Sequence, residues 1–116
     1  ATPRAANGIY LTTIGSDIHQ IPTAQAFVNA YEARHGSVGA YSAYAYEATN
    51  IALWATRTAG RKDRRAVLTA MQQLRDYPGL FGLQNFDDHG DSLIRDIGLF
   101  TVKDGRFAFL KAASWD

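Results

Sequence analysis

Three segments of the chain repeat apolar residues every three or four positions, and this spacing predicts three helices. The segments cover about residues 24–35, 40–59 and 64–75. Gly36 and Gly60 directly follow the first two segments, at the position where glycine most often ends a helix. The pattern therefore predicts a helical central region with short connections.

Residues that cap helices stand before the first and third segments. Thr23 precedes the first segment and Asp63 precedes the third. Both residue types accept hydrogen bonds from the free N–H groups of a first helical turn. Tyr77-Pro78-Gly79 follows the third segment and is expected to stop that helix.

The second segment is the longest and contains no glycine or proline between Ala40 and Ala59. Its apolar residues at i, i+3, i+4 spacing are Tyr41, Tyr44, Ala45, Ala48, Ile51, Ala52 and Ala55. Tyr46, Leu53 and Trp54 widen the apolar surface beyond one stripe. A helix that is apolar around most of its circumference is buried on more than one side. We therefore expect it to lie between a sheet and neighbouring helices.

Extended segments flank the helices. Residues 8–14 are rich in β-branched and aromatic side chains and predict a strand. A short extended run at 80–86 follows the third helix. Residues 94–102 and 106–112 predict two strands joined by Asp104-Gly105, a dipeptide favoured in two-residue hairpin turns.

The order strand, three helices, short strand and hairpin predicts an α/β fold. No partner is evident for the strand at 8–14, and a strand needs partners for its backbone N–H and C=O groups. We expect these partners to come from a missing amino-terminal segment or from another copy of the chain. Exposed strand edges of this kind favour self-association or strand exchange.

The composition narrows the class of protein. A chain of 116 residues that is 47% apolar and 20% charged is typical of one small globular domain. The net charge of +1 gives no reason to expect nucleic acid as a partner. No apolar stretch reaches the ~20 residues of a membrane span, because Glu47, Asn50 and Arg57 interrupt the longest one.

Several kinds of chemistry have no residues to support them. The chain has no cysteine, which excludes disulfides, thiolate metal ligands and cysteine nucleophiles. The sequence contains no serine elbow, phosphate-binding loop or dinucleotide-binding glycine motif, and no nucleophile stands beside a base. We therefore expect no cofactor and no enzymatic activity.

Five short motifs follow one another in a recognisable order. They are Gly8-Ile9-Tyr10-Leu11-Thr12, Gly15-Ser16-Asp17, Phe27 to Gly36 (FVNAYEARHG), Gly39 to Ala48 (GAYSAYAYEA), and the turn with Gly82, Phe86-Asp87 and Gly90-Asp91. The set covers nearly the whole chain. In this order it resembles the periplasmic leucine/isoleucine/valine-type binding proteins, which have the type I periplasmic-binding fold.

The resemblance implies that the chain is the carboxy-terminal segment of a solute-binding protein. Such proteins have two α/β lobes joined by three crossovers and enclose a ligand between them. In the periplasm they bind amino acids or related small carboxylates, which they deliver to the membrane permease of an ABC importer. By resemblance, about residues 15–86 belong to one lobe, and residues 8–14 and 94–112 belong to the hinge or the other lobe.

The resemblance also implies that much of the protein lies outside this chain. Family members are roughly three times longer, within the range where chains form two domains. The missing amino-terminal segment is expected to supply most ligand contacts, including the groups that bind the α-carboxylate and α-amino group. Residues 1–7 have no apolar core of a signal peptide, so the export signal is also expected outside the chain.

Four residues are candidate ligand contacts. Tyr41 matches an aromatic residue that the family turns toward the cleft at the start of the long helix. Helix amino termini favour carboxylates, and an aromatic ring with a hydroxyl group suits a small amphipathic ligand. Tyr44 lies one turn further on, with core packing as its alternative. Ser42 is either a hydroxyl donor or an ordinary first-turn serine. Asp17 either meets a ligand amine or caps its own loop.

Two charged clusters have both a structural and a functional interpretation. Asp87, Asp88, His89 and Asp91 contain metal-ligand types, but their spacing differs from a calcium-binding loop, and turn chemistry explains the same residues. A basic cluster surrounds Asp63 and consists of Arg57, Arg61, Lys62, Arg64 and Arg65. A solvated basic turn is the favoured interpretation there, and a phosphate site is the alternative.

Two other functions stay open. A ligand-sensing domain of the same fold, in a receptor or regulator, would not transport its ligand. A signal peptide or lipobox before this chain would favour transport, whereas a transmembrane helix or DNA-binding module would favour sensing. A small α/β enzyme is the third alternative, and the absence of a catalytic set argues against it.

Overall fold

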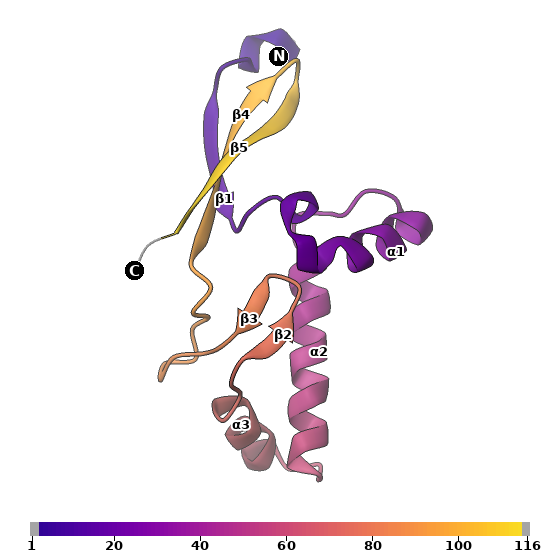
Figure 1. The fold of residues 1–116 in the computed structure, drawn as a ribbon, viewed down its shortest axis with the longest axis vertical. Helices are drawn as coiled ribbons and strands as arrows, with labels where there is room; N and C mark the ends of the chain where they lie inside the picture. The colour runs from indigo at the N-terminus through magenta and orange to yellow at the C-terminus, as the bar shows by residue number, and fades with distance from the viewer. Residues whose placement is uncertain (1–2, 115–116) are drawn as a thin grey trace. The chain divides into compact units, whose positions relative to one another are not determined.

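The computed structural model describes residues 3–114, which form two compact units (Figure 1). Unit 1 contains the residues up to Gln20 and from Arg95 onward, and unit 2 runs from Ile21 to Ile94. Unit 1 is mainly a sheet, whereas unit 2 carries the three helices and a small hairpin. The predicted α/β class is therefore confirmed.

Unit 1 is built on a three-stranded antiparallel sheet with the order β1-β4-β5. A 3-10 helix (Pro3–Ala6) precedes the strands, which are β1 (Tyr10–Ile14), β4 (Asp96–Lys103) and β5 (Arg106–Ser114). Asp104 and Gly105 join β4 to β5 with φ values of 50° and 76°. A tight hairpin turn that matches the twist of its strands requires positive φ at both central residues, so the predicted hairpin is confirmed.

The first strand has its partner within the chain. β1 pairs with β4, from Tyr10 opposite Thr101 to Ile14 opposite Ile97. The expectation that this partner comes from a missing segment or a second copy was therefore wrong for the paired edge of β1. The two strands lie on either side of all three helices in the sequence, and local patterns carry no signal for so distant a pairing.

Unit 2 contains the three predicted helices. They are α1 (Gln25–His35), α2 (Ser42–Ala59) and α3 (Arg64–Gln72), and a 3-10 helix (Pro22–Ala24) leads into α1. α2 begins at Ser42 and not at Ala40, and α3 ends at Gln72 and not at Arg75. Within residues 3–114, none of the helices is long and apolar enough to cross a membrane.

The helix caps follow the sequence with one exception. The Asp63 carboxylate accepts a hydrogen bond of 2.8 Å from the backbone N–H of Ala66, and Gly60 ends α2 in the left-handed conformation with φ 66°. Thr23 does not cap α1. It lies inside the 3-10 helix, and its hydroxyl donates to the carbonyl oxygen of Leu80 at 2.6 Å. The predicted Thr23 cap was wrong because a tertiary acceptor competes with the local one.

A second, two-stranded sheet lies against α2 (Figure 1). It pairs β2 (Tyr77–Gly79) with β3 (Gly82–Gln84). The sequence predicted the short extended run at 80–86 but assigned Tyr77-Pro78-Gly79 only to helix termination. Proline is tolerated in an edge strand, and a hairpin of this length depends on packing for its stability. The packing surface is α2, which no local pattern around Tyr77 indicates.

The buried face of α2 is narrower than predicted and rotated from the predicted stripe. The buried residues recur every fourth position and are Ala43, Glu47, Ile51 and Ala55. In contrast, Ala45, Ala48 and Ala52 are exposed, and Tyr41 is 72% exposed. Burial on more than one side is therefore not found among residues 3–114. An alanine-rich helix is weakly apolar all round, so its sequence does not select one face.

Glu47 is the polar member of this buried stripe. Its side chain is 6% exposed, and its carboxylate accepts backbone hydrogen bonds from Leu80 and Phe81 in the β2–β3 turn. Burial raises the pKa of the Glu47 carboxyl, and these two hydrogen bonds oppose that effect only in part. A buried carboxylate is tolerated only when it has such partners, so Glu47 fixes the turn to the amino-terminal half of α2.

Aromatic contacts flank the Glu47 anchor along α2. Tyr44 stacks on Phe81 with ring centroids 4.4 Å apart, and Trp54 meets Tyr77 edge-on at 6.1 Å. Toward the carboxyl end of the helix, α2 packs against α3. Tyr44, Glu47 and Trp54 thus hold the hairpin at three successive positions along α2.

Gly79 is a close-packed position in this contact. A Cβ atom at residue 79 would clash with the carboxylate of Glu47. We predict that Gly79→Ala lowers the free energy of unfolding by about 1–3 kcal/mol, as overpacking does elsewhere. Urea unfolding followed by circular dichroism measures the change.

A double-mutant cycle with Glu47→Ala tests the cause of that loss. If the clash with Glu47 is responsible, Gly79→Ala costs less in the Glu47→Ala background than in the native chain, by about 0.5–3 kcal/mol. Simple additivity of the two substitutions would contradict the proposed contact.

The raised pKa of Glu47 predicts a dependence of stability on pH. A carboxyl whose pKa is raised on folding binds its proton more tightly in the native state. Its contribution to stability is therefore complete below the unfolded pKa and is lost as pH rises through the folded value. We expect the native chain to gain stability relative to Glu47→Gln as pH falls from 7 toward 4.5. Urea unfolding of both chains across this range measures the difference, and a constant or opposite trend would refute the burial of this group.

Candidate functional site

The amino-terminal end of α2 presents the leading candidate residue. Tyr41 is the N-cap residue of α2, and its side chain makes no capping hydrogen bond. The ring is 72% exposed, although aromatic rings of this size are usually well buried. The amino terminus of the helix beside it carries a positive partial charge. This end of α2 therefore combines an exposed aromatic surface with an environment that favours a carboxylate.

Ser42 is the first helical residue and joins α2 to α1. Its hydroxyl oxygen lies 3.1 Å from the hydroxyl oxygen of Tyr31, near the middle of α1. The Ser42 side chain is half-buried. The hydroxyl is thus occupied by a contact between helices, and it holds the start of α2 in place.

Tyr44 lies one turn into α2 and packs against the β2–β3 turn. Its ring is nearly parallel to that of Phe81, at an interplanar angle of 12°. The side chain is half-buried. This geometry agrees with the core-packing interpretation of Tyr44 and shows how the first turn of α2 is supported.

A groove runs between α1 and the start of α2 in unit 2, with a volume of about 580 Å³. Its walls include Phe27, Tyr31 and Tyr46, with Arg34 and His35 at one end. Phe27 and Tyr46 are in ring contact at 4.7 Å. The Phe27–Tyr46 contact and the Ser42–Tyr31 bond connect α1 to the start of α2, next to Tyr41 in the sequence.

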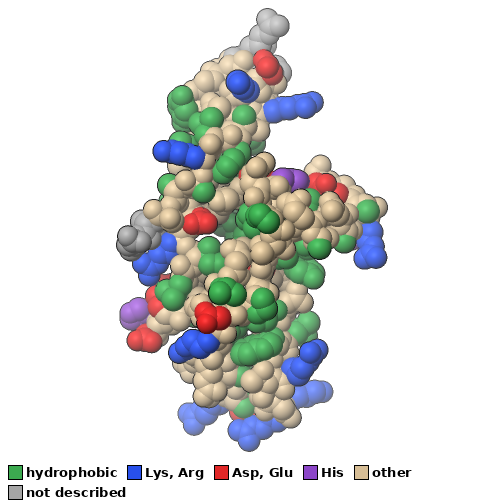
Figure 2. All heavy atoms as spheres, in the orientation of Figure 1, with side chains coloured by type: hydrophobic (Ala, Val, Ile, Leu, Met, Phe, Trp, Pro, Cys, Tyr) green, Lys and Arg blue, Asp and Glu red, His purple; other side chains and the backbone are tan. Residues whose placement is uncertain are grey.

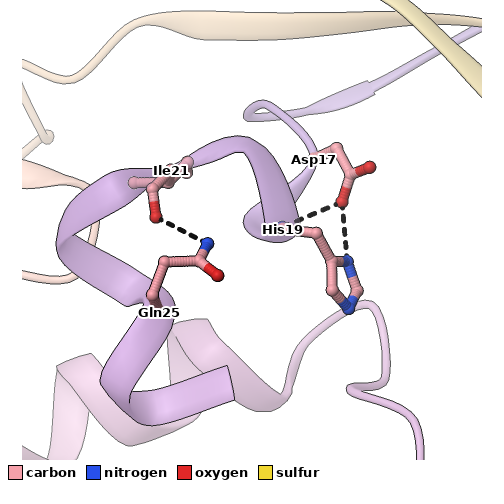
Figure 3. Close-up of polar contacts among 4 residues, drawn as sticks. All are labelled: Asp17, His19, Ile21 and Gln25. Atoms are coloured by element: carbon pink, nitrogen blue, oxygen red, sulfur yellow. Dashed lines mark hydrogen bonds and ion pairs between the residues drawn. The ribbon is translucent and has the colours of Figure 1, made fainter. Parts of the chain in front are cut away.

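Asp17 belongs to unit 1 and caps its own loop (Figure 3). One carboxylate oxygen accepts from the backbone N–H of His19 at 3.0 Å and lies 2.9 Å from Nδ1 of the same residue. The loop forms a short 3-10 helix, Ile18–Gln20, in which the Gln20 N–H bonds the Asp17 carbonyl. The capping role predicted as the alternative for Asp17 is therefore present.

A comparable local bond occurs at the start of unit 2. The Gln25 side-chain amide donates to the carbonyl oxygen of Ile21 at 3.1 Å (Figure 3). This bond holds the entry to α1 in the absence of an N-cap side chain.

The acidic segment 87–91 is a hydrogen-bonded turn. One oxygen of Asp87 accepts from the backbone N–H groups of His89 and Asp91, each at 2.9 Å. The hydrogen bond from Asp91 is the main cause that lowers the pKa of Asp87. The turn interpretation is confirmed. Over residues 3–114, no group of three His, Asp or Glu side chains is placed to hold a metal ion.

The sequence did not indicate the residues that support the start of α2. Tyr31 in α1 and Phe81 in the β2–β3 turn contact the first turn of α2, and Glu47 within α2 binds the same β2–β3 turn. Glu47 had one local signal, because it is the only charged residue between Ala40 and Thr56. Phe81 and Tyr31 had none, since their partners are set by tertiary contacts.

The sequence and fold match known periplasmic binding proteins. The family model "Periplasmic binding protein" matches residues 1–106. A leucine binding protein from Thermotoga maritima is 28% identical, with a TM-score of 0.81 over 95% of this chain. A substrate-binding protein of an ABC transporter from Desulfitobacterium hafniense, in complex with leucine, is 26% identical, with a TM-score of 0.72 over 92% of this chain.

A third solved structure supports the fold alone. It is the isoleucine complex of a branched-chain amino acid transporter substrate binding protein from Streptococcus pneumoniae, 21% identical, with a TM-score of 0.77 over 99% of this chain. A search among curated proteins finds no match. The chain spans 32% of the length of each of these three structures.

The match extends over nearly all of the sequence and over both units. The three helices and the strands correspond to part of a type I periplasmic-binding fold. The chain therefore belongs to the periplasmic binding protein family.

Proposed function

We propose that this chain is part of the extracytoplasmic receptor of an ABC importer for amino acids or related small carboxylates. Family membership supports a solute-binding role. The leucine complex of the Desulfitobacterium hafniense neighbour supports amino acids as the ligand class. The exposed Tyr41 at the amino end of α2 is the observation that carries the proposal, because an aromatic ring beside a helix amino terminus suits a small molecule with a carboxylate and an apolar part.

The rest of the proposed receptor would come from sequence outside these residues. The neighbours are about three times as long, since this chain covers 32% of each. Residues 15–86 are proposed to form part of one lobe, and residues 8–14 and 94–112 part of the hinge or the other lobe. The division of the chain after Gln20 and Ile94 supports this assignment. A missing amino-terminal segment would complete the lobes, and an ABC permease in the membrane would accept the released ligand.

The proposed mechanism begins with the first turn of α2. A ligand carboxylate near the helix amino terminus gains from the positive end of the helix dipole. The Tyr41 ring then covers the apolar side chain of the ligand, in the way that aromatic walls line small-molecule sites. Closure of the two lobes would remove the ligand and the Tyr41 ring from water. Reopening at the permease would release the ligand.

Ser42, Tyr44 and Asp17 have different roles in this proposal. Ser42 and Tyr44 are held by Tyr31 and Phe81, so they position the helix start and contribute to binding mainly through it. Asp17 uses one carboxylate oxygen for its loop. Asp17 belongs to unit 1 and is proposed as a contact for a ligand amine separately from the α2 residues.

Tyr41→Ala in the complete receptor is the direct test. We expect the affinity for leucine, isoleucine or valine to fall by about tenfold or more, because a buried aromatic contact contributes several kcal/mol at a binding site. Calorimetry with each amino acid measures the change. Tyr41→Phe separates the ring from the hydroxyl, and it keeps most of the affinity if the ring covers an apolar side chain.

Leu53→Ala is a matched control on the same helix. Leu53 is 59% exposed and lies three turns beyond Tyr41, so its loss should leave ligand affinity unchanged. Full affinity in Tyr41→Ala would contradict the proposed contact. Failure of the native receptor to bind any of the three amino acids would contradict the proposed ligand class.

A further inference from the structure

The carboxyl end of α2 and the start of α3 carry a concentrated positive charge. The basic patch consists of Arg57, Arg61, Lys62, Arg64 and Arg65. With Asp63 included, this segment has a net charge of +4, whereas the seven other basic and ten other acidic residues give the rest of the chain −3. Figure 2 shows Lys and Arg side chains gathered at the end of unit 2 where α2 meets α3. The overall charge of +1 therefore conceals a strong local asymmetry.

The charges of the basic patch are not neutralised by neighbouring carboxylates. All five basic side chains are exposed, and none forms an ion pair with any residue in the described range 3–114. Asp63, the acidic residue among them, uses its carboxylate to cap α3 through the Ala66 N–H. Like charges held this close repel one another, so an anion that binds between them gains from several cations at once.

A hollow of about 370 Å³ lies between α2 and α3 within this patch. Arg65 and Thr69 lie one turn apart on α3, and Gln73 is the C-cap residue of that helix. Arg61 and Thr58 come from the α2 side. Two guanidinium groups, two hydroxyls and a carboxamide thus line one hollow. Arginine pairs bidentately with phosphate oxygens, and hydroxyl and amide groups donate to the oxygens that remain.

We propose that this hollow binds a phosphate group. The chemistry fits either free phosphate or the phosphodiester of an anionic lipid headgroup. The site is separate from the proposed solute site, because the 18 residues of α2 place the two ends of the helix about 27 Å apart. The inference therefore does not depend on the proposed transport function.

Two binding measurements on the full chain distinguish the sources of phosphate. Inorganic phosphate is titrated by calorimetry, and vesicles containing phosphatidylglycerol are compared with vesicles of phosphatidylcholine alone in a sedimentation assay. The double variant R61Q/R65Q is expected to lower the affinity for the ligand that binds by about tenfold or more. The double variant R95Q/R106Q removes the same charge from exposed positions in unit 1 and should change that affinity less than about twofold.

A folding control and the pattern of binding decide whether this hollow is a phosphate site. Arg61 and Arg65 are exposed, so their replacement should leave the circular dichroism spectrum and the unfolding midpoint unchanged. Binding of phosphate, or of phosphatidylglycerol vesicles alone, supports the site and identifies its source. Absence of binding to both probes overturns the proposal. Equal losses in R61Q/R65Q and R95Q/R106Q also overturn it, because they would show an effect of net charge and not of this hollow.

Discussion

The buried carboxylate of Glu47 is the constraint around which unit 2 is arranged. A charged group removed from water is costly unless hydrogen-bond donors replace the lost solvent. The backbone N–H groups of Leu80 and Phe81 are those donors, and they come from a turn far away in the sequence. Gly79 permits the close approach because it has no side chain. One residue of α2 thereby fixes the position of the β2–β3 hairpin.

This arrangement also orders the two ends of α2. The same turn supplies Phe81, which stacks on Tyr44 and supports the first helical turn, while the Ser42–Tyr31 contact ties that turn to α1. Tyr41 is left exposed on a well-supported helix end. The opposite end packs against α3 and carries the basic patch. The proposed solute contact and the proposed phosphate site therefore belong to one rigid element but lie at its two termini.

Local patterns predicted the elements whose stability is mainly local. The glycine caps of α1 and α2, the Asp63 cap and the Asp104-Gly105 turn each act within a few residues, and all were evident from sequence. The ordered motifs also identified the family. In contrast, the β1–β4 pairing, the β2 strand and the Thr23–Leu80 bond each join distant segments. The buried face of α2 was also missed. Alanines lie on every side of this helix, so its sequence does not show that the face with Glu47 is the buried one. The contact role of Tyr41 stays a prediction, since it depends on a ligand and on the rest of the binding cleft.

A crystal structure of the complete receptor with bound leucine is the most direct test of the account. We expect the leucine carboxylate at the amino end of α2 and the Tyr41 ring in van der Waals contact with the ligand, at about 4 Å between carbon atoms. A structure with leucine enclosed between the lobes and Tyr41 turned to solvent would contradict the central claim that α2 presents the ligand-binding surface of this chain.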